Sequence, residues 1–171
     1  MDNKKNHNVA FADESNWNTG RYRSICVLSL NLDDLKGLNK HILEVLSESD
    51  MKEFKWEKLD SAKYRFAAEK LLDTVFSYLS KIRIDTIIWD IQDSRHTVPK
   101  RDDNANLARM YYHLLRNIMV HRWPDNSIWS FYPDEHSAID WKNLHTFLDI
   151  RSNFDIGLRQ SDTGLEIVYK E

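Results

Sequence analysis

The sequence predicts an α/β protein, a layered sheet with helices packed on it. Short runs rich in apolar and β-branched residues alternate along the chain with longer segments whose apolar residues recur at helical spacing. Only four glycines and three prolines are present, which leaves few of the turns that an all-β sandwich or barrel needs. We therefore expect long helices and a single domain over residues 1–171.

The first third of the chain is predicted to form two strands and a helix. Residues 1–7 are polar and are expected to be loose. The apolar run 9–11 predicts the first strand, and residues 22–32 predict the second. Asp33 and Asp34 are typical of an N-cap pair and indicate that a helix follows directly.

The middle of the chain carries the clearest helix and the most strand-like run. Residues 53–56 alternate charged and aromatic side chains, which is typical of a short strand or an extended crossing. An apolar stripe from Tyr64 to Ile82 predicts a long helix. Residues 84–91 are almost continuously apolar and β-branched, so we expect a strand in the centre of the sheet.

The second half is predicted to contain two helices and two strands. In chain order these are a helix with its apolar stripe from Leu107 to Ile118, a strand at 128–132, a helix at 138–148 and a last strand at 165–169. Such alternation of strands and helices is typical of a layered α/β sheet.

Composition limits the classes of partner. A hydrophobic content of 42% and an aromatic content of 12% describe a packed globular protein. The net charge of −3 supplies no global attraction to nucleic acid or to an anionic membrane, so a nucleic-acid site would have to be a local patch. No apolar run approaches the ~20 residues that cross a bilayer. The single cysteine, Cys26, lies in the apolar run 25–28 and is expected to be a reduced core residue, in keeping with a cytoplasmic protein.

Three predicted strands end in acidic residues. Asp13 and Glu14 follow the first strand, Asp90 lies near the end of the strand at 84–91, and Asp134 and Glu135 follow the strand at 128–132. If parallel neighbours bring these ends together, Asp13, Asp90 and Asp134 converge. Oxygen ligands without a cluster of His or Cys favour Mg²⁺ or Mn²⁺. A pair of such cations supports phosphodiester hydrolysis.

Each carboxylate also has a structural explanation. Asp13 or Ser15 can cap a local bend. Asp90 can accept from a loop amide, or pair with Arg95 or Lys100. One residue of the pair Asp134-Glu135 can be the N-cap of the following helix. The seven histidines show no spacing typical of a metal site, and neither a glycine-rich phosphate loop nor a Gly-x-Ser-x-Gly elbow is present.

Cations alternate with aromatic residues at 52–58 and 63–66. This mixture is suited to gripping phosphates and stacking on bases. The alternative is that Phe54, Trp56 and Phe66 are core residues with solvated lysines between them, and from the sequence alone we favour this alternative.

Four short segments follow one another along the chain: Phe-Ala-Asp-Glu-Ser at 11–15, Glu-Phe-Lys-Trp at 53–56, Trp-Asp at 89–90 and Tyr-Pro-Asp-Glu at 132–135. Together they resemble a bacterial family of unknown function that opens with an Asp-Glu-Ser-Gly strand and is placed by its fold among ribonuclease H-like proteins. The resemblance implies a mixed central sheet flanked by helices. In this chain Asn16 stands where the family has the glycine, and the family's C-terminal helix is expected to be absent after residues 169–171.

The resemblance also implies a metal-dependent nuclease that hydrolyses RNA or single-stranded DNA. Asp13 and Glu14 would be metal ligands or their close support, and Asp90 and Asp134 would supply the remaining carboxylates. Glu53 and Lys55 would line the site, with Lys55 suited to the scissile phosphate. A second hypothesis is a non-catalytic binding or assembly module with a vestigial acidic site, in which a partner chain or a second copy buries an uncovered apolar face.

Overall fold

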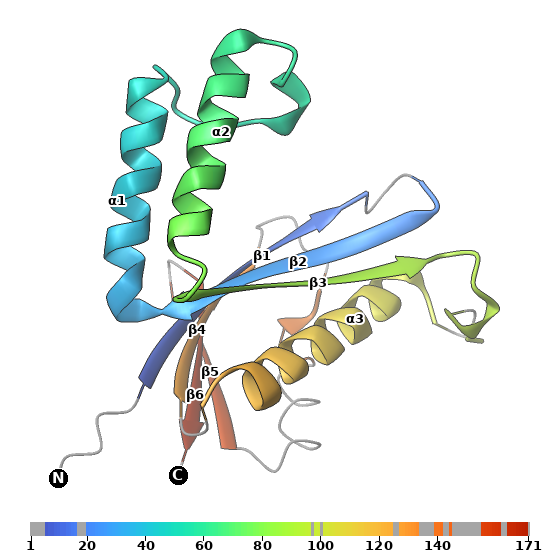
Figure 1. Ribbon diagram of the computed structural model, residues 1–171. Helices are drawn as coiled ribbons and strands as arrows, with labels where there is room; N and C mark the ends of the chain where they lie inside the picture. The colour runs from blue at the N-terminus through green and yellow to red at the C-terminus, as the bar shows by residue number, and fades with distance from the viewer. Residues whose placement is uncertain are drawn as a thin grey trace, which may run out of the picture. The chain divides into compact units, whose positions relative to one another are not determined.

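The computed structural model confirms an α/β fold built on a mixed sheet (Figure 1). The structure describes residues 6–16, 20–96, 98–99, 101–124, 127–133, 139–141, 144, 155–161 and 164–170, the last two ranges for their backbone alone. Among these residues, no helix is long and apolar enough to span a bilayer.

Six strands form one sheet in the order β3-β2-β1-β4-β6-β5. β1 and β4 are parallel, whereas β6 is antiparallel to both β4 and β5. The strands are β1 Asn6–Ser15, β2 Tyr22–Asn31, β3 Ile82–Asp90, β4 Ser127–Tyr132, β5 Asp155–Ser161 and β6 Gly164–Lys170. The strand β5 was not predicted from the sequence, and side-chain periodicity over 155–161 gives no clear signal for it.

Two expectations about the strands are wrong. β1 begins at Asn6 and runs to Ser15, so Asn6 and His7 are not loose and the acidic pair lies inside the strand rather than after it. β3 is the first strand in the sheet order, at its edge rather than in its centre. An apolar run resembles a central strand in sequence, but in β3 every second residue from Ile84 to Ile88 is exposed.

The chain clusters into two compact units, one formed by Met1–Ser29 with Arg83–Glu171 and the other by Leu30–Ile82. The second unit contains the helices α1 (Leu32–Glu48) and α2 (Ala62–Ser77), which pack on each other, and the short 3₁₀ helix η1 (Trp56–Lys58). The segment 53–56 therefore forms no strand, contrary to one of the two predicted conformations.

The ends of these helices differ from the predicted ends. Asn31, rather than Asp33 or Asp34, is the N-cap of α1, and its side-chain oxygen accepts from the Asp33 N–H at 3.0 Å. Helix α2 ends at Ser77, so Ile82 does not continue the stripe but begins β3. An apolar stripe marks a buried face but not the residue at which the helix stops.

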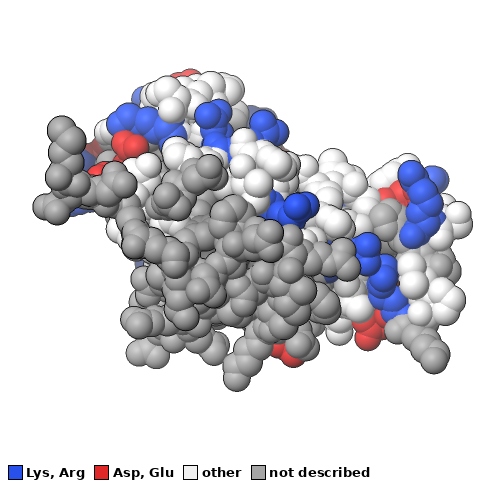
Figure 2. Space-filling model, turned by 90° about the horizontal axis from the view of Figure 1, so that it is seen from below, with Lys and Arg blue, Asp and Glu red and all other residues white. Residues whose placement is uncertain are grey.

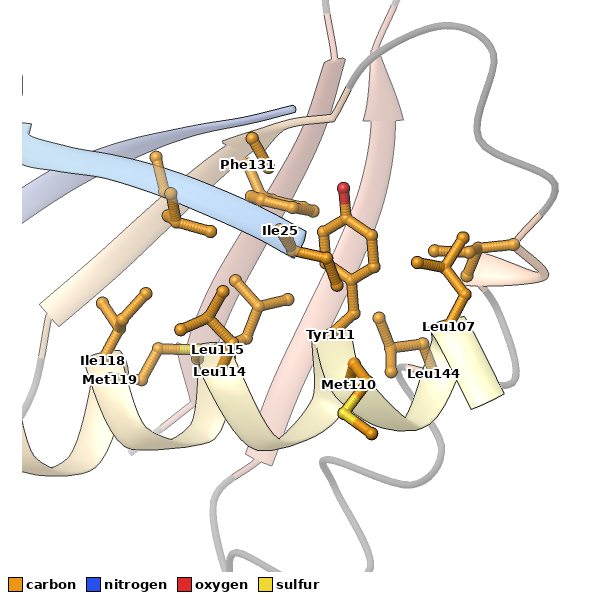
Figure 3. Close-up of a cluster of buried hydrophobic side chains, with 14 of the residues drawn as sticks. Ile25, Leu107, Met110, Tyr111, Leu114, Leu115, Ile118, Met119, Phe131 and Leu144 are labelled. Atoms are coloured by element: carbon orange, nitrogen blue, oxygen red, sulfur yellow. The ribbon is translucent and has the colours of Figure 1, made fainter. Parts of the chain in front are cut away.

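The core of the first unit lies between α3 (Asp103–Asn117) and one face of the sheet. Asp102 caps α3 by accepting from the Ala105 N–H at 2.8 Å, and a π-helical turn, η3 (Ile118–Arg122), follows it. Figure 3 shows Tyr111 and Leu115 of α3 lying beside Ile25 of β2 and Phe131 of β4. The helix predicted from the stripe 107–118 is confirmed.

Cys26 is exposed, which corrects the expected core position. Its neighbours Ile25 and Val27 are fully buried against α3. Because successive side chains of a strand point to opposite faces, Cys26 lies on the other face of the sheet.

Candidate functional site

The paired acids of β1 point to opposite faces of the sheet. Ala12 belongs to the core against α3, and Glu14, two residues later, lies on the same face. The Tyr111 hydroxyl of α3 donates to Glu14 Oε1 at 2.9 Å. Asp13 is therefore directed to the face opposite α3. A single metal ion therefore cannot bind both carboxylates, although their adjacency in the sequence suggests that it could.

Asp13 is exposed, and its carboxylate makes no hydrogen bond or ion pair with any residue in the described ranges. Phe11, on the same face of β1, stacks on Tyr132 of β4 with ring centroids 5.2 Å apart and an interplanar angle of 17°. The two residues are also opposite each other in the parallel register. Among the described residues, therefore, no cation compensates the negative charge of Asp13, which lies beside an ordered aromatic pair.

Asp90 ends β3 and shares the sheet face of Asp13, because Trp89 before it is buried in the core against α3. Arg21 donates to Asp90 Oδ2 through Nε at 2.9 Å and through Nη2 at 2.6 Å. The Gln92 N–H donates to Oδ1 at 2.9 Å. The hydrogen bond from Arg21, followed by that from Gln92, holds the pKa of Asp90 below its usual value.

The loop amide predicted as one partner of Asp90 is therefore confirmed. Of the two predicted cations, Arg95 is wrong, and Lys100 lies outside the described residues. Arg95 pairs with Asp93 instead, through Nε at 2.9 Å and 3.0 Å. Arg21 was missed because it lies 69 positions away in the sequence and only the sheet brings it to Asp90. No local signal identifies such a partner.

The converging site requires Asp13, Asp90 and Asp134 to meet. The parallel pairing of β1 with β4 that it needs is present, with Tyr132 opposite Phe11. Asp90, however, is on β3, and β2 lies between β3 and β1. At about 4.8 Å per strand, β3 lies about 10 Å from β1 across the sheet, so Asp13 and Asp90 are not on neighbouring strands. Asp134 and Glu135 lie outside the described residues.

Within the described ranges, no three residues of the types His, Cys, Asp and Glu form a group able to hold a metal ion. Asp90 is neutralised by Arg21, and Glu14 faces α3. The described carboxylates therefore do not fit a complete Mg²⁺ or Mn²⁺ site by themselves.

Glu53 and Lys55 belong to the unit 30–82, whereas Asp13 and Asp90 belong to the other unit. Lys55 Nζ lies 3.4 Å from Glu53 Oε2, and the side chains are 45% and 70% exposed, respectively. Because this ion pair is solvated, it contributes little to stability, and neither side chain is held there by burial.

The aromatic residues next to this pair are not core residues as favoured from the sequence. Trp56 is 61% exposed and Phe66 is 46% exposed, and Phe54 is only partly buried. Phe54 meets Trp56 edge to face at 4.9 Å and also contacts Tyr64, with centroids 5.9 Å apart. Within the unit 30–82, residues Phe54, Trp56 and Tyr64, with the cations Lys52, Lys58 and Arg65, are called the aromatic–basic cluster below.

On the described part of the face seen in Figure 2, basic side chains do not form one continuous field. Figure 2 shows Lys and Arg in separate small groups, with acidic residues near several of them. This agrees with the net charge of −3. Any attraction to phosphate is therefore local.

Comparison with known proteins found two relatives in Methanothermobacter thermautotrophicus. The uncharacterized protein ORF2′ is 44% identical over 151 residues, which is 82% of this chain and 52% of the relative. The uncharacterized protein ORF2 is 41% identical over 158 residues, 86% of this chain and 55% of the relative. The chain thus spans about half the length of the curated relatives it matches. Because both relatives are archaeal, they do not support the expectation that this chain belongs to a bacterial family.

No family model matches the chain. No solved structure matches it either.

Proposed function

We propose that this protein is a metal-dependent phosphodiesterase that hydrolyses RNA or single-stranded DNA, with Asp13 as a ligand of Mg²⁺ or Mn²⁺. The exposed carboxylate of Asp13, which has no ion pair or hydrogen bond among the described residues, carries the proposal. A surface carboxylate without a cation beside it is available to a hard divalent ion. The ribonuclease H-like resemblance and the mixed sheet around β1 support the same assignment.

The proposal demands more ligands than the described residues supply. Asp90 shares the face of Asp13 but is bound by Arg21. Its use as a ligand requires the Arg21 side chain to move, which its exposed position permits. Asp134 is the third ligand that the proposal assigns. Glu14, bound by Tyr111, supports the position of β1 rather than the ion.

Incubation with end-labelled single-stranded RNA and DNA in Mg²⁺ or Mn²⁺ tests the proposal. Asp13→Asn should lower the cleavage rate at least 100-fold, since the substitution removes a charged ligand while keeping its shape. Asp33→Asn in the first turn of α1 is the matched control and should cleave as the parent protein does. Equal rates in both variants identify a contaminant and reject the site.

A second candidate, an assembly module, is favoured by the edge strand β3. Ile84 and Ile88 are 52% and 66% exposed on one face of this strand. In an antiparallel pair of two β3 strands centred on Thr86, Ile84 of each copy lies opposite Ile88 of the other. Exposed apolar edges of this kind are templates for strand pairing.

Light scattering after size-exclusion chromatography tests this candidate. Assembly through β3 predicts a dimer that Ile88→Lys converts to a monomer, because the substitution replaces the apolar contact between Ile88 and Ile84 of the other copy with a charge. Leu43→Lys on α1, at a side chain 55% exposed, is the control and should leave the dimer intact. A parent protein that is monomeric at 50 μM, well above the usual Kd of a stable dimer, rejects the candidate.

A further inference from the structure

We propose that the aromatic–basic cluster of the unit 30–82 binds single-stranded nucleic acid, with unpaired bases stacking on Trp56. The inference names a surface that binds the substrate of the proposed nuclease, and to that extent it rests on the proposed function. Binding itself uses no carboxylate of the sheet, so the two ideas can fail separately.

The rings of the cluster form a fixed platform. Phe54 meets Trp56 at 88°, with centroids 4.9 Å apart, and so supports the indole ring from its edge. Tyr64, in the first turns of α2, lies 5.9 Å from Phe54 at 42°. Trp56 still has 61% of its surface exposed. A large aromatic surface that is held in place and left in water is typical of a recognition site.

Lys58 lies against the platform, and other cations are close to it in the sequence. Lys58 Nζ lies 5.7 Å from the centre of the Tyr64 ring. Within this fully described unit, Lys52, Lys58 and Arg65 have no ion pair, whereas Lys55 and Lys63 are paired with acids. Residues 52–66 contain five cations and three carboxylates, so this segment is positive although the whole chain is negative. Phosphates are therefore attracted to this segment.

The combination of exposed aromatic rings and cations favours a single strand over a duplex or an apolar protein partner. An apolar protein partner would gain from the rings but not from exposed cations around them. A duplex offers phosphates but keeps its bases stacked inside. A single strand offers both a chain of phosphates and free base faces, which stack on aromatic rings with little sequence preference.

Fluorescence anisotropy with a labelled 20-nucleotide single strand, in EDTA and low salt, tests binding without cleavage. Trp56→Ala should weaken binding about 10- to 100-fold because one stacked base is lost. Trp56→Phe should restore most of the affinity. Phe76→Ala is the matched control, since Phe76 of α2 is also 61% exposed but is not part of the cluster. Its affinity should equal that of the parent protein.

An abasic strand of the same length separates stacking from charge, because it carries the phosphates without the bases. We expect it to bind weakly and to be insensitive to Trp56→Ala. Lys58→Gln should reduce the slope of log K against log salt by about 0.7, the value for one phosphate contact on a single strand. Lys36→Gln, on the exposed surface of α1, should not change the slope.

Equal binding of the abasic and normal strands, or equal affinity of Trp56→Ala and the parent protein, would overturn the inference. So would the absence of binding by the parent protein. Urea denaturation of each variant excludes unfolding as the cause of a loss. Binding in EDTA without cleavage in Mg²⁺ rejects only the nuclease, and cleavage without binding that depends on Trp56 rejects only this inference.

Discussion

At the scale of single residues, the pair Arg21–Asp90 shows how a partner changes what a carboxylate can do. The guanidinium satisfies one carboxylate oxygen of Asp90 twice, and the Gln92 N–H satisfies the other. Both interactions favour the ionised form. Without these partners, Asp90 would be a carboxylate without an ion pair, like Asp13, which has no such partner among the described residues.

Arg21→Gln should raise the pKa of Asp90 toward its ordinary value of 3.8, and the remaining bond from Gln92 should keep it somewhat below. Because the folded-state pKa is lowered, this pair stabilises the fold above pH 3.8 and loses its effect as the pH falls through the folded-state pKa. The variant should therefore be less stable than the parent protein at pH 7 and equally stable once Asp90 is protonated in both.

Carbon-13 NMR titration of the Asp90 carboxyl measures the pKa, and urea denaturation at several pH values measures the stability. The difference should be small and should shrink with salt, since Arg21 is half-exposed. Arg83→Gln, at the exposed start of β3, is the control. An unchanged Asp90 pKa in Arg21→Gln would show that the pair does not persist in solution.

At the scale of elements, α3 packs against the sheet face on which Glu14 lies. Tyr111 of α3 contributes both to the core and to a polar contact: its ring is fully buried against Phe131, and its hydroxyl donates to Glu14. The periodic stripe in the sequence identifies Tyr111 as a core residue. It does not identify the hydrogen bond, because the partner is 97 positions away.

Leu107→Ala should lower the free energy of unfolding by about 2–5 kcal/mol, because Leu107 is 1% exposed and its removal leaves a cavity between α3 and the sheet. Urea denaturation measures the change. Arg109→Ala, on the exposed side of the same helix, should stay within about 0.5 kcal/mol of the parent protein. A loss of less than about 1 kcal/mol for Leu107→Ala would contradict the packing of α3.

At the scale of the whole molecule, a metal that binds only the folded state must raise its stability. At a hundredfold excess of Mg²⁺ over Kd, the gain is about 2.7 kcal/mol. For a chain of this size that corresponds to roughly 5–10 °C in Tm. Asp13→Asn should abolish the increase, whereas Asp33→Asn should keep it. Calorimetry that shows no increase in the parent protein, or equal increases in every variant, would reject a metal ligand at Asp13.

The sequence by itself determined the α/β class and the position of most helices and strands. Period and composition are local properties, so the stripe 107–118 and the run 84–91 predict α3 and β3 without knowledge of their neighbours. The N-cap of α1, Asn31, lies two residues before Asp33 and three before Asp34, the predicted pair, because several polar residues compete for the same position.

Only the tertiary structure decided which of these residues are exposed and which carboxylates have partners. β3 is at the edge because of the strand order, and Trp56 is exposed because nothing in its unit covers it. Asp13 and Glu14 are separated because the strand continues through them and sends them to opposite faces. Burial and pairing depend on segments that are distant in the chain, and a local pattern does not show which of these segments pack against a given residue.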